Sequence, residues 1–189
     1  MTAVSPATGT RGPTPLGVGV VVWLASELMF FSGLFAAWFT LRAINDRWPP
    51  DGVELDVPRT ALATIVLLAS SVTMHVAVGR GKRADRAGAV RWLAVTATLG
   101  ALFLANQVSE YVDLGFSISD HAYGSIFFLL TGFHGLHVFG GLLLMGAVAA
   151  TIAGDSRAPS GPPVEVCAAY WHFVDAVWVG VFATVYLLG

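Results

Sequence analysis

Residues 123–153 read YGSIFFLLTGFHGLHVFGGLLLMGAVAATIA, a stretch without a single Asp, Glu, Lys or Arg. A helix crosses the hydrocarbon core of a membrane in about 20 apolar residues, so this stretch is long enough to span it and to tilt or project. Backbone polar groups in lipid must be satisfied within their own segment. The stretch therefore predicts a membrane-spanning helix, and that helix contains both His134 and His137.

The rest of the chain extends this interpretation. Of its 189 residues, 56% are hydrophobic and 12% are charged, whereas soluble domains carry about 25% charged residues. We expect an all-α, polytopic membrane protein, a bundle of five transmembrane helices. A short disordered tail is expected at residues 1–15 and a single five-helix transmembrane domain at 16–189. The five apolar segments cover about 16–41, 61–78, 90–108, 123–153 and 166–188.

The basic residues predict how the chain is oriented in the membrane. With the N-terminus inside, the inner segments hold seven Arg and Lys residues and the outer segments hold three. The loop GRGKRADRAGAVR, residues 79–91, contributes most of the difference. Short loops rich in Arg and Lys stay in the cytoplasm, so we expect a cytoplasmic N-terminus and an external C-terminus.

Composition also excludes some functions. The formal net charge of −2 argues against nucleic-acid binding driven by phosphate attraction. The one cysteine, Cys167, excludes an intramolecular disulfide framework and a four-cysteine cluster. The chain also has no C-x-x-C-H haem attachment motif.

Ionisable residues within the spans are the candidate functional groups, because a charge near the bilayer centre costs about 2.5–3.5 kcal/mol on insertion scales. These residues are Glu27, His134, His137, His172 and Asp175. Counting along each helix at 1.5 Å per residue places them at overlapping depths. We therefore expect them to face one another inside the bundle, with Glu27 hydrogen-bonded to one of the two histidines of the fourth helix.

The residue types leave three interpretations of this polar cluster open. Histidines and carboxylates are suitable metal ligands, and His134 with His172 could ligate a haem from facing helices. However, a di-iron bundle uses Glu-x-x-His motifs, and the chain has His-x-x-His instead. A proton pathway is the second interpretation. The third is a hydrogen-bonded polar knot that fixes helix packing, helped by close approach at neighbouring glycines.

Three stretches carry a resemblance to a known family: ASELMFFSGLFAAWF (25–39), EYVDLGFSISDHAYGSIFFLLTGFHGLHVFGGLLL (110–144) and YWHFVDAVWVGVFATVYLLG (170–189). Together they resemble subunit III of the haem-copper respiratory oxidases, in the short five-helix form of bacterial cytochrome c oxidases and quinol oxidases. The residues that match the family's motifs are Glu27, Glu110, Tyr111, His134, His137, Glu165, Trp171, His172, Phe173, Asp175 and Trp178.

The resemblance implies a role within an aerobic terminal oxidase that reduces oxygen to water and pumps protons. In this family the haem and copper belong to subunits I and II, so it implies no metal site and no catalytic centre in this chain. It implies packing on subunit I, support of proton uptake and complex stability, and bound phospholipid. Arg42 is a candidate for a lipid phosphate. A cytochrome bc complex is a further candidate partner, and the expected location is the bacterial plasma membrane.

Two alternatives remain at this point. The chain could be subunit III of a quinol oxidase, because the subunit that binds the electron donor lies elsewhere. It could also be a stand-alone proton-coupled transporter that moves protons through Glu27, the histidines and Asp175. An oxidase subunit should purify with a haem-bearing partner, whereas a transporter should not.

Overall fold

The structure is a computed structural model and describes residues 15–155 and 157–188. The tail expected at residues 1–15 lies outside this part of the chain, except for Pro15. The described residues form helices and no strand. The elements are α1 (Pro15–Ile44), α2 (Val57–Lys82), α3 (Arg86–Asp113), α4 (Ala122–Gly154), α5 (Gly161–Phe182) and one π-helical turn (Ala183–Leu187).

All five helices are long and apolar enough to cross a membrane, which confirms the expected fold class. Helices α1 to α4 begin and end beyond the apolar segments that predicted them, whereas α5 begins before its segment and ends at Phe182. Polar side chains support the starts of α2 and α3. Asp56 and Asp85 cap α2 and α3 by accepting the backbone N–H of the residue three positions on, Arg59 and Gly88 respectively. Such caps satisfy amide groups that have no partner within the helix.

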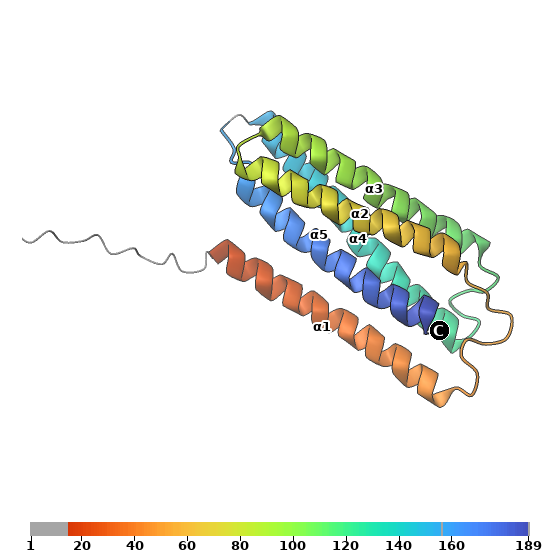
Figure 1. The fold of residues 1–189 in the computed structure, drawn as a ribbon. Helices are drawn as coiled ribbons and strands as arrows, with labels where there is room; N and C mark the ends of the chain where they lie inside the picture. The colour runs from red at the N-terminus through yellow and green to blue at the C-terminus, as the bar shows by residue number, and fades with distance from the viewer. Residues whose placement is uncertain (1–14, 156, 189) are drawn as a thin grey trace, which may run out of the picture.

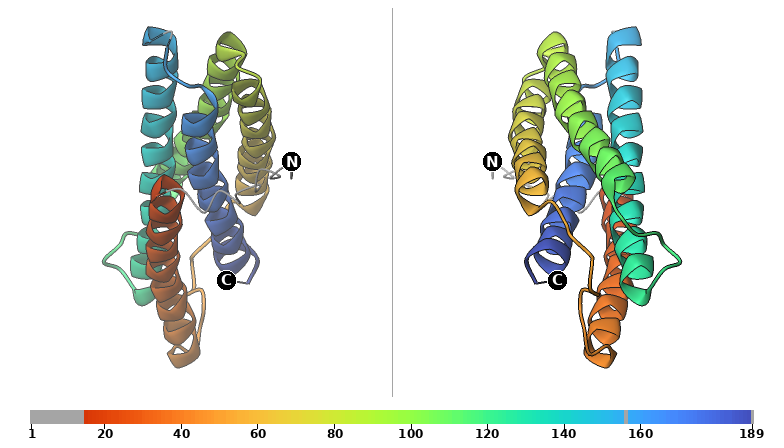
Figure 2. Two further views of the ribbon diagram at one scale, coloured as in Figure 1. Left: turned by 90° about the vertical axis from the view of Figure 1, so that its left-hand side faces the viewer. Right: turned by 90° about the vertical axis from the view of Figure 1, so that its right-hand side faces the viewer.

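Helices α2 to α5 form a bundle, and α1 lies along one side of it against α4 and α5 (Figures 1 and 2). Among the residues of α1 whose burial the structure describes (17–44), Phe31 and Trp38 are the ones in the buried core. Near one end of α1, Trp38 packs against Trp48 and Tyr123 at ring-centroid distances of 5.1 and 5.3 Å. Most side chains of α1 are therefore exposed on the outside of the bundle.

Trp171 of α5 is the centre of the four-helix core. Its indole N–H donates to the hydroxyl of Ser70 on α2 at 2.9 Å. Its ring lies against Gly100 of α3 and Gly141 of α4, where an added Cβ atom would come within 2.6 and 2.8 Å of ring carbons. Small residues that let helices approach closely are a common packing device in membranes. One tryptophan thus fixes the spacing of four helices.

Polar contacts fasten the end of the bundle where α2 meets α3 and α4 meets α5. Lys82 of α2 and Glu165 of α5 form an ion pair at 3.3 Å. The guanidinium of Arg86 at the start of α3 donates to three carbonyl groups at the end of α4 and in the loop after it, those of Ile152, Asp155 and Ala158. These bonds satisfy carbonyl oxygens that the helix end leaves open.

Candidate functional site

Glu27 of α1 and His137 of α4 form a hydrogen-bonded pair, which confirms that Glu27 bonds to one of the two histidines of the fourth helix. The Oε2 atom of Glu27 lies 2.9 Å from Nε2 of His137, and Nδ1 of His137 lies 2.7 Å from the carbonyl oxygen of Phe133. A carbonyl only accepts, so Nδ1 carries a hydrogen. The second bond then needs one proton, held either by the carboxyl of Glu27 or by Nε2 of an imidazolium.

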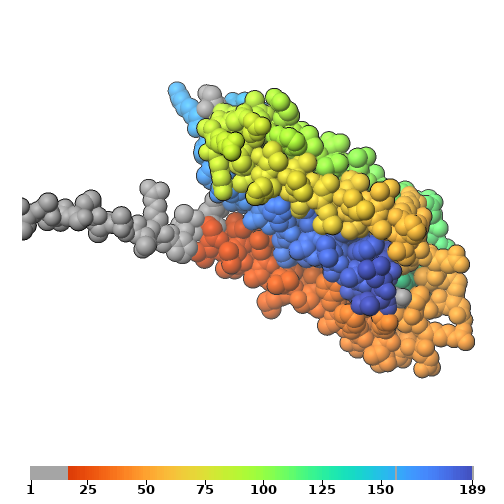
Figure 3. All heavy atoms as spheres, in the orientation of Figure 1, coloured from red at the N-terminus to blue at the C-terminus, as the bar shows by residue number. Residues whose placement is uncertain are grey.

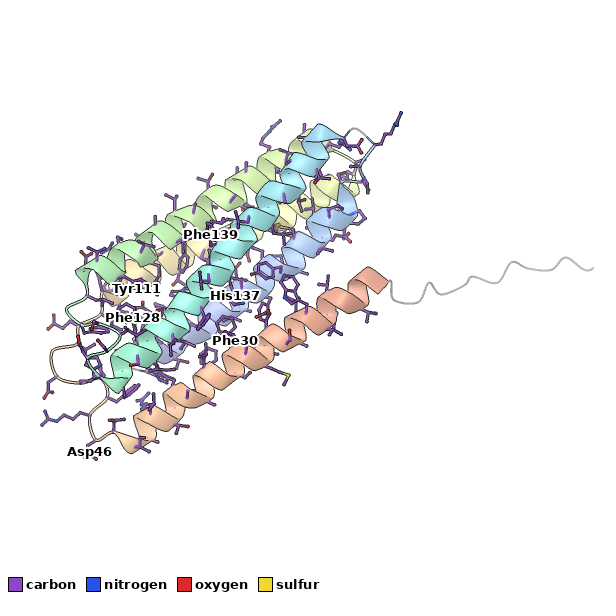
Figure 4. All side chains as sticks on the ribbon, turned by 180° about the vertical axis from the view of Figure 1, so that it is seen from behind. Phe30, Asp46, Tyr111, Phe128, His137 and Phe139 are labelled. Atoms are coloured by element: carbon purple, nitrogen blue, oxygen red, sulfur yellow. The ribbon has the colours of Figure 1, made fainter. Side chains whose placement is uncertain are left out.

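Aromatic side chains surround this pair at the junction of α1, α4 and α5. The indole N–H of Trp23 donates to the other carboxyl oxygen of Glu27 at 3.2 Å. Trp23 also stacks on Tyr170 of α5 at 4.9 Å, and the Tyr170 hydroxyl donates to the backbone carbonyl of His137 at 3.0 Å. Phe31 meets the ring of His137 edge-on at 4.9 Å. Figure 4 shows His137 directed towards α1, beside Phe30.

The pair is only partly enclosed by this chain. The side chains of His137 and Glu27 are 16% and 24% exposed. They lie on the surface where α1 joins the bundle, in a region that the lengths and apolar character of α1 and α4 place within the membrane. A carboxyl group and an imidazole in hydrogen-bond contact can share one proton between them. The arrangement is chemically suited to holding and releasing one proton.

His134 does not join this pair, although it is only three residues away. Its side chain is completely buried in the bundle core, with ring centroids 4.8 Å from Trp178 and 5.9 Å from Phe103. Neither ring nitrogen has a hydrogen-bond partner in the described part of the chain. Three helical residues turn the side-chain direction by about 300°, which leaves a difference of about 60° between the two histidines. His134 consequently faces the core and His137 faces α1.

His172 and Asp175 form a separate group with Ser71, at the junction of α2 and α5. Nδ1 of His172 lies 2.9 Å from the hydroxyl of Ser71, and that hydroxyl donates to Oδ2 of Asp175. The serine stands between the other two residues, so its proton is directed to the carboxylate and not to the histidine. This order differs from a nucleophilic triad, in which histidine takes the serine proton.

Buried Glu110, one of the acids that match the family's motifs, belongs to a third polar group, formed by α2, α3 and the π-helical turn. It accepts hydrogen bonds from Thr60 at 3.3 Å, Gln107 at 3.0 Å and Tyr186 at 2.9 Å. The π-helical turn brings the Tyr186 hydroxyl into the bundle. Sequence reasoning identified Glu110 but not its partners, since a threonine or glutamine in an apolar helix gives no signal of the helix it will face.

The single cluster expected from the sequence is therefore wrong in its geometry. The five side chains are divided between the junction of α1 with α4, the bundle core, and the junction of α2 with α5. Counting residues along a helix does not give the direction of each side chain around its axis, and this direction separates them. Within residues 15–155 and 157–188, no group of three or more His, Cys, Asp or Glu side chains is arranged to hold a metal ion.

Comparison with known proteins was made on the whole sequence. The family model for cytochrome c oxidase subunit III matches residues 9–189. A probable cytochrome c oxidase subunit 3 of Nocardia farcinica is 44% identical over 181 residues, which cover 93% of this chain and 89% of that protein. The Mycobacterium tuberculosis protein of the same name is 41% identical over the same shares. Cytochrome c oxidase subunit 3 of Thermostichus vulcanus is 38% identical, covering 90% and 86% of the two chains.

Proposed function

This chain belongs to the cytochrome c oxidase subunit III family, and on that premise we propose that it is the oxidase subunit that supports proton uptake without a redox centre of its own. Haem and copper, which supply the electron transfer and oxygen chemistry of the complex, are held by its partners, subunits I and II. The chain packs on subunit I and stabilises it.

The pair of Glu27 and His137 carries the proposal. It is partly exposed at an intramembrane surface, and its hydrogen bond holds one proton that either partner can release. A group of this kind can buffer protons beside the partner subunit that consumes them. Aromatic rings of α1 and α5 lie beside the pair and shield part of it from lipid, while its exposed part stays accessible to a neighbouring subunit.

The substitution Glu27→Gln tests the proton role against a purely structural one. A glutamine side chain can accept from Trp23 and donate to the lone pair of His137, so it reproduces the neutral hydrogen-bonded arrangement but cannot release a proton. We expect the complex to assemble with a normal haem spectrum. We expect its turnover and proton pumping to decline selectively at alkaline pH, where protons are scarce.

The matched control is Glu165→Gln, which alters an acid of the same chain that pairs with Lys82 at a helix end. It should leave the pH profile of turnover unchanged. Loss of the whole complex in Glu27→Gln would show that the pair only fastens α1 to α4. An assembled Glu27→Gln complex with normal turnover at every pH would contradict the proton role.

Further features of the proposal follow from the charges and the family. Residues 16–189 form one five-helix domain in the bacterial plasma membrane, with the N-terminus in the cytoplasm. Cytochrome c is the electron donor of the complex, and a cytochrome bc complex joins it in a larger respiratory assembly. Phospholipid binds to this subunit, and Arg42, at the last turn of α1, pairs with a lipid phosphate.

A further inference from the structure

One surface of the bundle differs from the others, and α5 runs along its middle. The exposed residues of α5 recur every three or four positions and form one stripe: Glu165, Ala169, His172, Ala176 and Val179. In the space-filling view α5 lies between α2 on one side and α1 on the other (Figure 3). We call this surface, made by the α5 stripe and the adjacent sides of α1 and α2, the α5 groove.

The side of the α5 groove next to α1 is apolar and hollow. A cavity of about 200 Å³ lies between the two helices, and Ala176 and Gly180 are the small residues of α5 that line it. At Gly180 an added Cβ atom would already lie 3.1 Å from the ring of Phe35. The residues that line the cavity are Leu28, Phe31, Ser32, Phe35, Phe173, Ala176, Val177 and Gly180. Small residues on an exposed helix face allow another helix to approach closely in a membrane.

The side next to α2 is polar at a depth where lipid is apolar. His172 lies 11 residues after the start of α5, about 16 Å along the helix, and its side chain is exposed. His75 of α2 is also exposed and lies close enough to His172 for the two rings to interact electrostatically. Ionisable side chains within membrane spans almost always face protein or a water-filled cavity.

The hydrogen bonds of this group determine what His172 presents to a neighbour. The Ser71 hydroxyl has one proton and donates it to Asp175, so towards His172 its oxygen accepts and Nδ1 carries the hydrogen. In the neutral ring Nε2 is then an acceptor without a partner in the described chain. Asp175 is 4% exposed, and its Oδ1 atom also lacks a partner there. Oδ1 of Asp175 is enclosed by the chain itself, whereas Nε2 of the exposed His172 is open to a donor from a neighbouring helix.

The outer surface formed by α3 and α4 is apolar in the described part of the chain. Its exposed large hydrophobic side chains are Val95, Leu102, Val108, Val112, Leu129, Leu136, Phe139 and Leu143. Figure 4 shows this side, with Phe139 labelled on α4. A surface of aliphatic and aromatic side chains is suited to lipid. The exposed His172 therefore distinguishes the α5 groove from the apolar outer surface of α3 and α4.

From these observations we infer that the α5 groove is the docking site for one transmembrane helix of the haem-bearing partner subunit. That helix places a side-chain hydrogen-bond donor opposite His172 and packs over Ala169 and Ala176. The inference rests on the proposed function and adds to it the surface and the chemistry of the contact.

Photo-crosslinking in the assembled oxidase tests the location. One variant carries p-benzoylphenylalanine in place of Ala176 in the α5 groove, and a matched variant carries it in place of Leu143 on α4. After illumination of membranes, we expect the variant substituted at Ala176 to form a crosslink to the haem-bearing subunit. We expect no such crosslink from the variant substituted at Leu143. Crosslinking from Leu143 alone, or from neither position, in a complex that still contains haem would overturn the inference and leave the proposed function intact. A chain that purifies with no haem protein would overturn the proposed function itself.

A second variant tests the chemistry without depending on the crosslinker. His172→Phe keeps a ring of similar width but removes the acceptor, whereas Leu143→Phe makes a comparable change on the lipid-facing surface. The loss of one intramembrane hydrogen bond corresponds to about a threefold weaker association. The complex is diluted in detergent and captured through a tag on the haem-bearing subunit, and the amount of this subunit that stays bound is measured. We expect the His172→Phe subunit to be released at about threefold lower dilution. Equal retention of the two variants would contradict a donor opposite His172.

Discussion

Gly141→Ala provides a quantitative test of the core. The added Cβ atom would lie 2.8 Å from ring carbons of Trp171, whereas carbon atoms in contact prefer about 3.5–4.0 Å. The ring would have to move by about 0.7 Å or more. It cannot move freely, because Gly100 lies against another edge of the ring, where an added Cβ atom would be only 2.6 Å away, and the hydroxyl of Ser70 accepts its N–H. Overpacking of this kind costs about 1–3 kcal/mol.

The helix preference of alanine opposes this cost, so a control is needed. Replacing glycine by alanine within a helix stabilises it by about 0.5–1 kcal/mol. Gly146 lies on the same helix, and an added Cβ atom there would meet nothing within 4 Å. Gly146→Ala should therefore show the helix effect alone. The helix terms cancel between the two variants, so Gly141→Ala should be less stable than Gly146→Ala by about 1–3 kcal/mol.

The free energy of unfolding can be compared by titrating SDS into the purified chain in mild detergent micelles and following loss of helix by circular dichroism. Equal stability of the two alanine variants, or a more stable Gly141→Ala, would refute the argument. It would mean that the indole of Trp171 has room to shift and does not fix the spacing of α3 and α4.

Two further predictions concern the ends of the bundle. The backbone N–H of Gly88 and the guanidinium of Arg80 hold the pKa of the Asp85 carboxyl below its ordinary value of 3.8, so its stabilising effect is present above that pH and is lost as the pH falls further. As the pH is lowered below about 4, the SDS concentration at the unfolding midpoint should decrease in the unsubstituted chain. It should decrease less steeply in Asp85→Asn, because asparagine caps the helix but does not titrate. Parallel pH profiles of the two chains would contradict this. Arg86→Ala should lower the free energy of unfolding by about 1.5–3 kcal/mol, because the carbonyl groups at the end of α4 lose a charged donor, and Arg86→Lys should lose less. An unchanged midpoint in Arg86→Ala would show that water replaces the guanidinium.

The sequence was sufficient to predict the number and approximate positions of the helices. In a membrane each span must be a long apolar helix, so hydropathy alone identifies it, and five such helices are present. Depth could also be counted along each helix, which is why Glu27 was correctly paired with a histidine of α4. The choice between His134 and His137 could not be made, because it depends on how α4 is rotated about its own axis.

Rotation is hard to predict here for a physical reason. Lipid is as apolar as leucine, so the hydrophobic effect does not select which face of a membrane helix points inward. Packing of small and polar residues decides it instead, as where Trp171 enters the space left by Gly100 and Gly141. The partners of Glu110 and Asp175 were missed for the same reason. Ser71 and Thr60 read as ordinary members of an apolar helix until α2 is turned towards α3 and α5.

The attachment of α1 depends on the same kind of contact. Among residues 17–44 of this helix, Phe31 and Trp38 are the large side chains that are buried, so the bond between Glu27 and His137 and the stack of Trp23 on Tyr170 hold much of its junction. With one proton in the pair, either partner can carry it and the hydrogen bond persists. If that proton leaves, a carboxylate oxygen faces the lone pair of Nε2 and two acceptors repel each other. The docking of α1 is therefore coupled to the protonation of the pair. Glu27→Gln should uncouple them, because its amide keeps a hydrogen in the bond at every pH.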